Sequence, residues 1–301
     1  MITPPYLVPG DSIGIISTAS RINRDVVEPA ITFLKDKGFK VITGKHTFST
    51  HYQYSATDKE RAEDLQQMLN NTQIKAILCS RGGYGTLRTI SHINWNSFMQ
   101  CPKWIIGFSD ITVLHAALQL NKVASIHGVM PKFFIENNAP TTSLSTLLNA
   151  LCGHKLEYTI SHNPFNRYGK CEGPLVGGNL SVLYSLRGTP IDLDTAGKIL
   201  FIEDVDEYKY HIDRMMLNFK IGTKLENLAG LIVGSFSGVK DHDQPYGKTI
   251  EEIILDAVEG TDYPVLFDFP AGHSKENYAI KFGLSASIDV NKTESHFLQH
   301  S

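Results

Sequence analysis

Short apolar runs alternate with amphipathic segments over the first 130 residues. The apolar runs are typical of strands buried on both faces, and the segments between them carry apolar residues at helical spacing. The predicted strands are SIGIIST (12–18), FKVITG (39–44), IKAILCS (74–80) and KWIIGFS (103–109). Helices are predicted over 24–38 and 56–71, in a short stretch before residue 103, and from the last strand through Asn121. This alternation predicts a parallel α/β sheet with helices on both faces.

The pattern loosens between about residues 131 and 172, where polar segments flank one apolar helical stretch, TLLNALCG. We therefore predict an N-terminal α/β domain over 1–133, a linker over 134–172 and a C-terminal domain over 173–301. The strand candidates of the C-terminal domain are KILFIED (198–204), GLIVGSF (230–236), VLFDFP (265–270) and the tail segment NYAIKFGLSASIDV. Residues beyond that segment, with His296 and His300, are expected to fray.

Composition narrows the class of protein. A chain of 301 residues with 42% hydrophobic content can bury one large core or two modest ones. No window approaches the roughly 18 uninterrupted apolar residues of a membrane span, and the N-terminal residues lack a basic region followed by an apolar signal core. The four cysteines are scattered and form no CxxC pair. We expect a cytoplasmic protein without disulfides.

Charge argues against a nucleic-acid partner. The formal net charge is -3 and the sequence has no basic run, whereas phosphate binding needs clustered Lys and Arg. His242 in KDHDQ resembles a metal ligand flanked by carboxylates, but no HExxH motif or second cluster accompanies it. We expect a small-molecule partner and no metal.

One serine stands where a buried strand ends and a helix begins, in IIGFSDITVLH (105–115). Ser109 would lie at the carboxyl edge of the sheet, which is the geometry of a nucleophile elbow. The unpaired N–H groups of the helix N-terminus would favour a developing alkoxide and oxyanion. The residues alone leave an alternative open, because Ser109 and Asp110 are also typical helix caps and Ile111 replaces the second glycine of the hydrolase motif.

A glycine loop, SRGGYGTLR (80–88), follows the strand that precedes Ser109, so it is expected at the same edge of the sheet. Backbone amides of Gly82 and Gly83 would face that of Asp110 across a carbonyl oxygen and form an oxyanion hole. The loop lacks the GK[ST] ending of a P-loop and the spacing of the dinucleotide fingerprint. It is therefore weak evidence for nucleotide binding.

A nucleophilic serine needs a base, and two of the twelve histidines are candidates by position. His127, in SIHGVMP, ends a strand at the edge where Ser109 lies. His273, in FDFPAGHS, follows another apolar strand. His115 is six residues after Ser109 and is expected in the core or at its boundary. Chain position does not choose between His127 and His273.

An orienting carboxylate is available at the end of another apolar strand. Glu203, in KILFIEDVDE, would be costly to bury without a partner, and a positioned imidazole would be that partner. The three acids that follow fit a simpler role at the start of a helix: Asp204, Asp206 and Glu207.

Several separated motifs occur together in one order along nearly the whole chain. They are LVPGDSIGIISTAS, SRGGYGTLR, IIGFSDITVLH, GPLVGGNLSVL, FIEDVDEYKYHIDRMM, FPAGHS and IKFG. In this combination the sequence resembles the LD-carboxypeptidases, serine peptidases of murein recycling that also include microcin-C-immunity-like members. The resemblance implies a triad of Ser109, Glu203 and His273, with an oxyanion hole from the backbone amides of Gly83 and Asp110.

The resemblance also implies a fold and a partner. The expected fold is a flavodoxin-like N-terminal domain with a parallel sheet and a smaller, β-rich C-terminal domain, in a homodimer. The nucleophile would lie on one domain and its base on the other. The implied reaction is acyl transfer without a metal or other cofactor, releasing D-Ala from cytoplasmic murein tetrapeptide.

Substrate recognition is less constrained by the sequence. Arg81 and His127 are candidates for binding substrate, Arg81 because a free carboxylate is usually bound by arginine. One alternative is a peptidase of peptidyl-nucleotides, in which Phe165 or Tyr168 would stack on the base. Another is a binding protein without catalysis, in which Ser109 is a cap.

Overall fold

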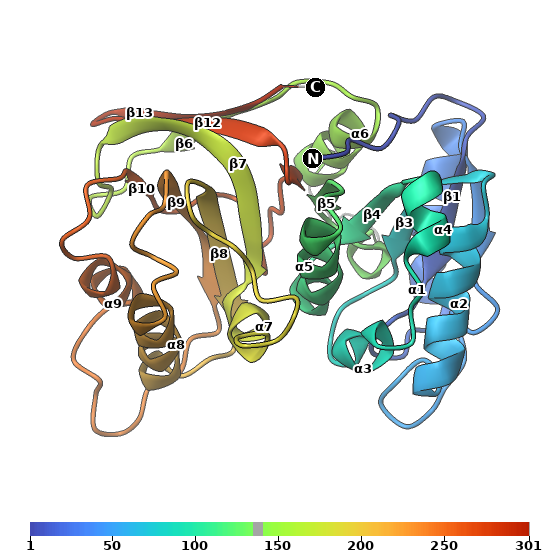
Figure 1. The fold of residues 1–301 in the computed structure, drawn as a ribbon, viewed down its shortest axis with the longest axis horizontal. Coiled ribbons are helices and arrows are strands. Elements are labelled where there is room, and N and C mark those ends of the chain that lie inside the picture. The colour runs from blue at the N-terminus through green and yellow to red at the C-terminus, as the bar shows by residue number, and fades with distance from the viewer. Residues whose placement is uncertain (135–140, 301) are drawn as a thin grey trace.

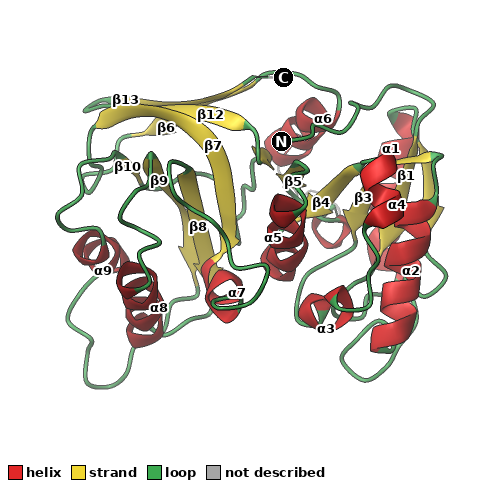
Figure 2. Cartoon of the chain, viewed as in Figure 1, coloured by secondary structure: helices red, strands yellow, loops and turns green. Residues whose placement is uncertain are grey.

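Two β-sheets, each with its own helices, lie side by side in the protein (Figure 1). The structure is a computed structural model, and it describes residues 1–134 and 141–300. Helix α5 (Thr112–Leu120) lies between the two units and packs against β7 (Gly169–Asn179) and α7 (Leu180–Ser185). Figure 2 shows the mixed α/β character of both units.

The N-terminal sheet has six strands in the order β11-β5-β4-β3-β1-β2. Five of them are parallel, and their order 2-1-3-4-5 is that of flavodoxin-like folds. The elements of this unit are β1 Ser12–Ile16, α1 Arg24–Asp36, β2 Lys40–Thr43, α2 Asp58–Asn70, β3 Ile74–Cys79, α3 Thr86–Ile90, α4 Asn96–Gln100, β4 Trp104–Gly107, the 3-10 turn Ser109–Ile111, α5, β5 Ser125–His127 and a second 3-10 turn, Pro131–Phe133. The flavodoxin-like fold expected from the sequence is confirmed.

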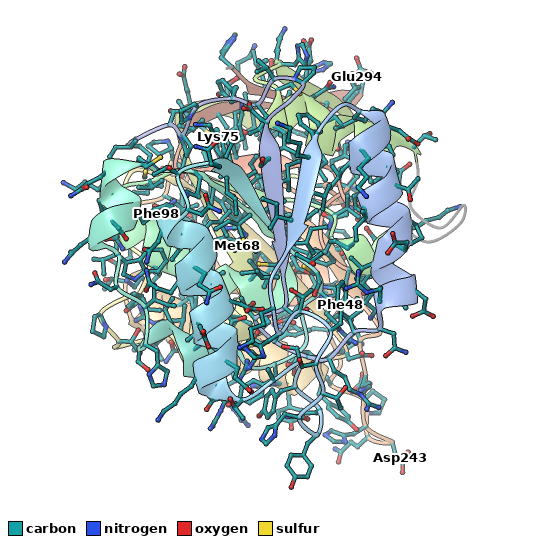
Figure 3. All side chains as sticks on the ribbon, turned by 90° about the vertical axis from the view of Figure 1, so that its right-hand side faces the viewer. Phe48, Met68, Lys75, Phe98, Asp243 and Glu294 are labelled. Atoms are coloured by element: carbon teal, nitrogen blue, oxygen red, sulfur yellow. The ribbon has the colours of Figure 1, made fainter. Side chains whose placement is uncertain are left out.

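Helices cover both faces of this sheet because α1 and α2 bury opposite apolar stripes. Val27 of α1 packs in the same cluster as Ile15 of β1, whereas Met68 of α2 packs in another with Ile16 and with Phe98 of α4. The alternating side chains of β1 therefore point to the two faces in turn. Figure 3 shows α1 and α2 on either side of the strands.

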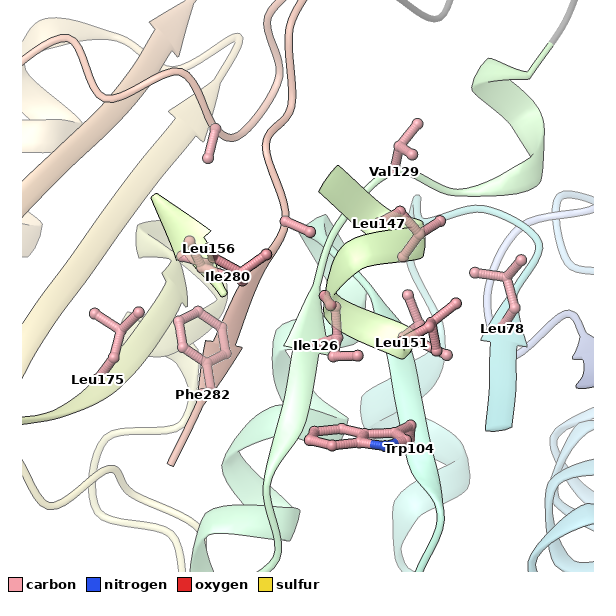
Figure 4. Packing of buried hydrophobic residues seen from close by; sticks show 14 of the residues in the cluster. Leu78, Trp104, Ile126, Val129, Leu147, Leu151, Leu156, Leu175, Ile280 and Phe282 are labelled. Atoms are coloured by element: carbon pink, nitrogen blue, oxygen red, sulfur yellow. The ribbon is translucent and has the colours of Figure 1, made fainter. Parts of the chain in front are cut away.

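The sixth strand of the N-terminal sheet comes from the end of the chain. Strand β11 (Ile280–Phe282) pairs antiparallel with β5, with Ile280 opposite His127. Ile280 and Phe282 join the same apolar cluster as Ile126 of β5 and Leu175 of β7 (Figure 4). The segment just before β11 is thereby held against the edge of the N-terminal sheet.

The C-terminal sheet has seven strands in the order β10-β9-β8-β7-β12-β13-β6. The first four are parallel and the rest are antiparallel. Its elements are α6 Thr141–Leu151, β6 Leu156–Ser161, β7, α7, β8 Ile199–Val205, α8 Lys209–Ile221, β9 Gly230–Ser237, α9 Ile250–Ala257, β10 Val265–Leu266, β12 Ser285–Val290 and β13 Glu294–Gln299. The β-rich second unit expected from the sequence is confirmed.

Two details differ from the sequence prediction. The tail does not fray, since β13 pairs with both β12 and β6 and buries Phe297 completely. The stretch 134–172, predicted as a linker, contains α6 and the sheet strand β6 and ends inside β7. No helix in the described part of the chain is long and apolar enough to cross a membrane.

Candidate active site

A cavity of about 560 Å³ lies at the carboxyl edge of the N-terminal sheet and is also lined by residues that follow strands of the C-terminal sheet. Ser109, Gly82 and Gly83 contribute to its wall from the first unit, and His273 does so from the second. Carboxyl ends of parallel strands are the usual place for a binding site in such sheets. The cavity thus brings together groups more than 150 residues apart in the chain.

Ser109 has the backbone geometry of a sharp turn between strand and helix. Its φ is +64°, in the left-handed region that residues other than glycine adopt rarely and at a cost. It follows β4 by two residues and opens the 3-10 turn that leads into α5. No side-chain capping bond forms at the start of that turn or of α5. The simpler interpretation of Ser109 as a helix cap therefore has no support in its contacts.

The glycine loop packs directly against this turn. A Cβ atom at Gly82 would lie 2.8 Å from Cβ and 2.9 Å from Oγ of Ser109, so only glycine allows so close an approach. Gly83 has a φ of +113°, and a Cβ there would meet the Ser20 hydroxyl. At both positions a side chain would clash with a neighbour, so glycine is needed there for a steric reason that the sequence pattern did not reveal.

Asp110 connects the loop to the turn through its side chain. Its buried carboxylate accepts a hydrogen bond of 2.8 Å from the backbone N–H of Thr86, the first residue of α3. Burial raises the pKa of Asp110, against the effect of the hydrogen bonds from Thr86. Among the described residues, no acceptor pairs with the backbone amides of Gly83 and Asp110, the two predicted oxyanion donors.

Glu203 and His273 form a hydrogen-bonded pair. Glu203 is fully buried near the end of β8, and its Oε2 accepts a bond of 2.7 Å from Nδ1 of His273. Because an ionised carboxylate only accepts hydrogen bonds, this contact puts the proton on Nδ1 and leaves Nε2 as the basic atom. The loop that carries His273 is also held through its backbone, because the Ser237 hydroxyl donates to the His273 carbonyl at 2.7 Å.

The surroundings of His273 favour its protonated form. Burial alone would lower the pKa of His273, but the hydrogen bond and the charge of Glu203, helped by the charge of Asp204, raise it above 6.5. The charge of Lys132 acts in the opposite direction.

His273 lies beside the serine turn. Its ring is 4.9 Å from that of Phe108, the residue before Ser109, in an edge-to-face contact. No hydrogen bond joins the Ser109 hydroxyl to His273 in the part of the chain that the structure describes. Such contacts are often long in the absence of substrate and shorten in the reacting complex.

The glycine-rich motif GPLVGGNLSVL ties the two halves of the site together. The N–H of Asn179 donates to Oγ1 of Thr112 at 2.9 Å, and its side-chain amide donates to Asp204 at 3.0 Å. Thr112 is three residues after Ser109, and Asp204 is next to Glu203. Asn179 therefore links the strand of the carboxylate to the helix of the serine.

His127 does not line the cavity, contrary to the sequence prediction of a direct substrate contact. It is fully buried, and its ring packs against Phe108, Phe201 and Phe282. Burial, and then the charge of His115, lowers its pKa well below 6.5. His115 lies in the core, as expected, between Ser125 and the Gly107 carbonyl.

Asn277 was not identified from the sequence, although it touches both histidine segments. Its Oδ1 accepts from the N–H of Gly272 at 3.0 Å, which fixes that atom as oxygen, and it lies 3.2 Å from Nε2 of His127. His127 must therefore donate from Nε2. The only sequence signal was the position of Asn277, four residues after His273.

Other candidates are placed elsewhere or newly found. Phe165 packs against Phe267 in an apolar core of the C-terminal unit, and Tyr168 is exposed on another surface. Neither residue lines the cavity. Arg81 does line it, together with Lys132, which no sequence pattern singled out. Within residues 1–134 and 141–300, no group of three or more His, Cys, Asp or Glu side chains is placed to hold a metal ion.

Comparisons with known proteins agree with this geometry. Sequence models of the LD-carboxypeptidase N-terminal and C-terminal domains match residues 13–128 and 172–288. The chain is 35% identical to a probable murein peptide carboxypeptidase of Bacillus subtilis, covering 95% of this chain and 91% of that protein. It is 25% identical to the microcin C7 self-immunity protein of Escherichia coli, covering 97% and 94% of the two chains.

A solved structure extends the likeness to the whole fold. The crystal structure of muramoyltetrapeptide carboxypeptidase from Oxalobacter formigenes superimposes with a TM-score of 0.89 at 26% identity, covering 96% of this chain and 99% of the other. Both sequence models match in chain order and together span most of the chain. The protein therefore belongs to the LD-carboxypeptidase family.

Proposed function

We propose that the protein is a serine carboxypeptidase that hydrolyses an L,D-peptide bond and releases terminal D-Ala from murein tetrapeptide during cytoplasmic wall recycling. The observation that carries this proposal is the convergence on one cavity of Ser109, on a strained turn, and the Glu203–His273 pair. The murein peptide carboxypeptidases among its relatives support the choice of substrate.

The mechanism follows from the positions of the protons. His273 accepts the Ser109 hydroxyl proton at Nε2 while Glu203 holds Nδ1–H and stabilises the imidazolium. The Ser109 oxygen attacks the carbonyl carbon, and the amides of Gly83 and Asp110 donate to the oxyanion. His273 then protonates the leaving amine, and the C–N bond breaks to give D-Ala and an acyl-enzyme. Water, deprotonated by His273, releases the acyl group and restores the serine.

The direct test is release of D-Ala from purified murein tetrapeptide, detected by mass spectrometry. A parallel reaction with a peptidyl-adenosine conjugate tests the alternative of a peptidyl-nucleotide peptidase. We expect the tetrapeptide to be cleaved much faster, because the aromatic candidates for base stacking, Phe165 and Tyr168, lie outside the cavity. Cleavage of the conjugate alone would favour that alternative, and cleavage of neither would favour a binding protein without catalysis.

The activity should depend on pH through His273. Only neutral His273 can accept the serine proton, so kcat/KM should fall as the pH decreases through the raised pKa, with a midpoint above 6.5. In Glu203→Gln the hydrogen bond to an ionised partner is lost while burial remains. The midpoint should then move to lower pH, and kcat should drop by about 10⁴-fold.

A neighbouring carboxylate provides the control for this pH profile. Asp204→Asn removes a charge beside Glu203 without touching the hydrogen bond to His273. Burial, and then the charge of Glu203, raises the pKa of Asp204 to about 7, so this group also titrates near neutral pH. We expect a smaller shift of the midpoint than in Glu203→Gln. An equal or larger shift would assign the pH dependence to Asp204.

The closeness of Gly82 to the serine gives a second prediction. In Gly82→Ala the new methyl group would lie 2.9 Å from Oγ of Ser109 and must displace it. A displacement of about 1 Å at a reacting atom can cost about 100-fold in rate, so we expect a loss of that order in kcat. The measurement is steady-state kinetics alongside thermal unfolding.

Gly128→Ala is the matched control for Gly82→Ala. Gly128 follows β5 near the same site, but a Cβ there would make only ordinary contacts, the nearest at 3.5 Å. We expect this variant to retain its activity. Similar losses in both variants would mean that any added methyl group in this region disturbs the site.

A further inference from the structure

The cavity is lined by three cations, Arg81, Lys132 and Lys275, and by one carboxylate, Asp206. Arg81 and Lys132 both line the cavity that contains Ser109. Neither forms an ion pair with a carboxylate of residues 1–134 or 141–300. Arg81 is partly buried, and an unpaired cation that is partly removed from water raises the free energy of the folded protein. A bound anion would relieve that cost.

The backbone brings the two cations to the same place. The N–H of Lys132 donates to the carbonyl of Ser80, the residue next to Arg81, at 3.0 Å. The Arg81 guanidinium donates from Nη1 to the carbonyl of Arg21 at 3.0 Å, which holds one corner of the group. Its Nε–H is buried and has no hydrogen-bond partner among the described residues. The guanidinium is thus anchored while a donor remains unused.

The electrostatics of the site show that these charges affect one another. Burial lowers the pKa of Arg81. Burial, and then the charge of Arg81, lowers the pKa of Lys132. The charge of Lys132 in turn lowers the pKa of His273. Lys132 lines the same cavity as Arg81 and the proposed base, His273.

The leaving group of a carboxypeptidase has a charge close to the bond that breaks. In the last residue of a peptide, the amine nitrogen and the carboxylate carbon are separated by only one Cα atom, through two bonds of about 1.5 Å. His273 must reach that nitrogen to protonate it, and Arg81 precedes the two glycines that flank the oxyanion site. A cation that is close to both His273 and the oxyanion site therefore lies within one residue's length of the scissile bond.

We infer that Arg81 and Lys132 together bind the terminal carboxylate of the residue that is released, and that this contact restricts cleavage to the last residue of the peptide. Arginine presents two parallel donors to a carboxylate, and lysine adds a point charge. This inference rests on the proposed function, because it places the released residue on the His273 side of Ser109. It adds Lys132 to the site and assigns the exopeptidase specificity to two side chains.

Binding to an inactive background tests the inference. Ser109→Ala would be titrated by calorimetry with murein tetrapeptide carrying a free terminal carboxylate and with the same peptide ending in a carboxamide. We expect the acid to bind about 10- to 100-fold more tightly, the range for hydrogen bonds to charged groups. Adding Lys132→Met or Arg81→Met should reduce this preference to within about 3-fold, mainly by weakening the acid.

Lys275→Met supplies the control for net charge. Lys275 is exposed and lines the same cavity, so its loss removes one positive charge without touching the proposed pair. The acid preference should persist in this variant. Lys132 is also exposed, so Lys132→Met should fold even if Arg81→Met disturbs the loop.

The outcomes separate this inference from the proposed function. D-Ala release by the active protein together with equal binding of acid and amide would overturn the inference and leave the function standing. The inference is also overturned if neither peptide binds, or if the acid preference survives in Lys132→Met and Arg81→Met. Acid-selective binding that needs both cations, without any D-Ala release, would retain the carboxylate site and reject the reaction.

Discussion

Ser109→Ala should abolish D-Ala release, with kcat at least about 1,000-fold below that of the unchanged protein, since removing the nucleophile of a serine protease costs about 10⁶-fold. The variant lacks the oxygen that forms the acyl-enzyme, so water must attack the peptide directly. The amides of Gly83 and Asp110 remain and can stabilise only that slow reaction. Quantitative detection of free D-Ala by mass spectrometry measures the effect.

The same variant should remain folded. Ser109 makes no capping bond at the start of its turn or of α5, and alanine has only a slightly smaller side chain. Serine and alanine both carry a Cβ atom, so the backbone strain at a φ of +64° is similar in the variant. Thermal unfolding should shift by no more than a few degrees. Substantial D-Ala release by a folded Ser109→Ala would remove the serine from the mechanism.

His273→Ala should show a comparable loss, and it distinguishes between the two histidines that the sequence left open. Without His273 no group bonded to Glu203 can accept the serine proton, and the carboxylate is left buried without its imidazole partner. We expect kcat to fall by about 10³-fold or more. Kinetics at saturating tetrapeptide separate this effect from weaker binding.

His127→Gln is the comparison variant because glutamine can place an N–H donor near the position of Nε2. That donor would preserve the bond to Asn277 and so the support of Gly272, next to His273. We expect most of the activity to remain, with some loss of stability because His127 is fully buried. A near-complete loss in His127→Gln with activity retained in His273→Ala would reverse the assignment of the base.

The sequence predicted the N-terminal sheet well because its strands are continuous apolar runs. β3 and β4 occupy the predicted segments, and all but one of their residues are buried. Strands β6 and β13, which each have one exposed polar face, were missed. Their buried and exposed residues alternate, and the exposed positions carry charged or polar side chains such as Glu157 and His296. Alternation over six residues is itself a strand signal, so β6 (LEYTIS) could have been predicted, whereas in β13 the buried positions include polar Ser295 and Gln299, which breaks the apolar pattern.

Prediction of the candidate site from the sequence was limited for a different reason. Ser109, Gly83 and Glu203 were selected because each stands at a strand end or in a glycine loop, and such positions can be predicted from the chain. His127 and His273 both satisfied that criterion. Chain position did not choose between them, and only the family resemblance selected His273. In the structure His127 turns into an aromatic core, whereas His273 contacts Glu203. Lys132 and Asn277 contact residues distant in sequence, Ser80 and His127, which no local pattern reveals.

Strand β11 prevents the N-terminal and C-terminal domains from being separated cleanly. By sequence, residues 280–282 fall within the match to the C-terminal domain, yet by hydrogen bonding they form the outer strand of the N-terminal sheet. An N-terminal fragment produced alone would expose the edge of β5, which invites aggregation. A chimera of two family members cut between the matched regions would join a β5 from one parent to a β11 from the other. Successful recombination within this family should therefore require that β5 and β11 be inherited together.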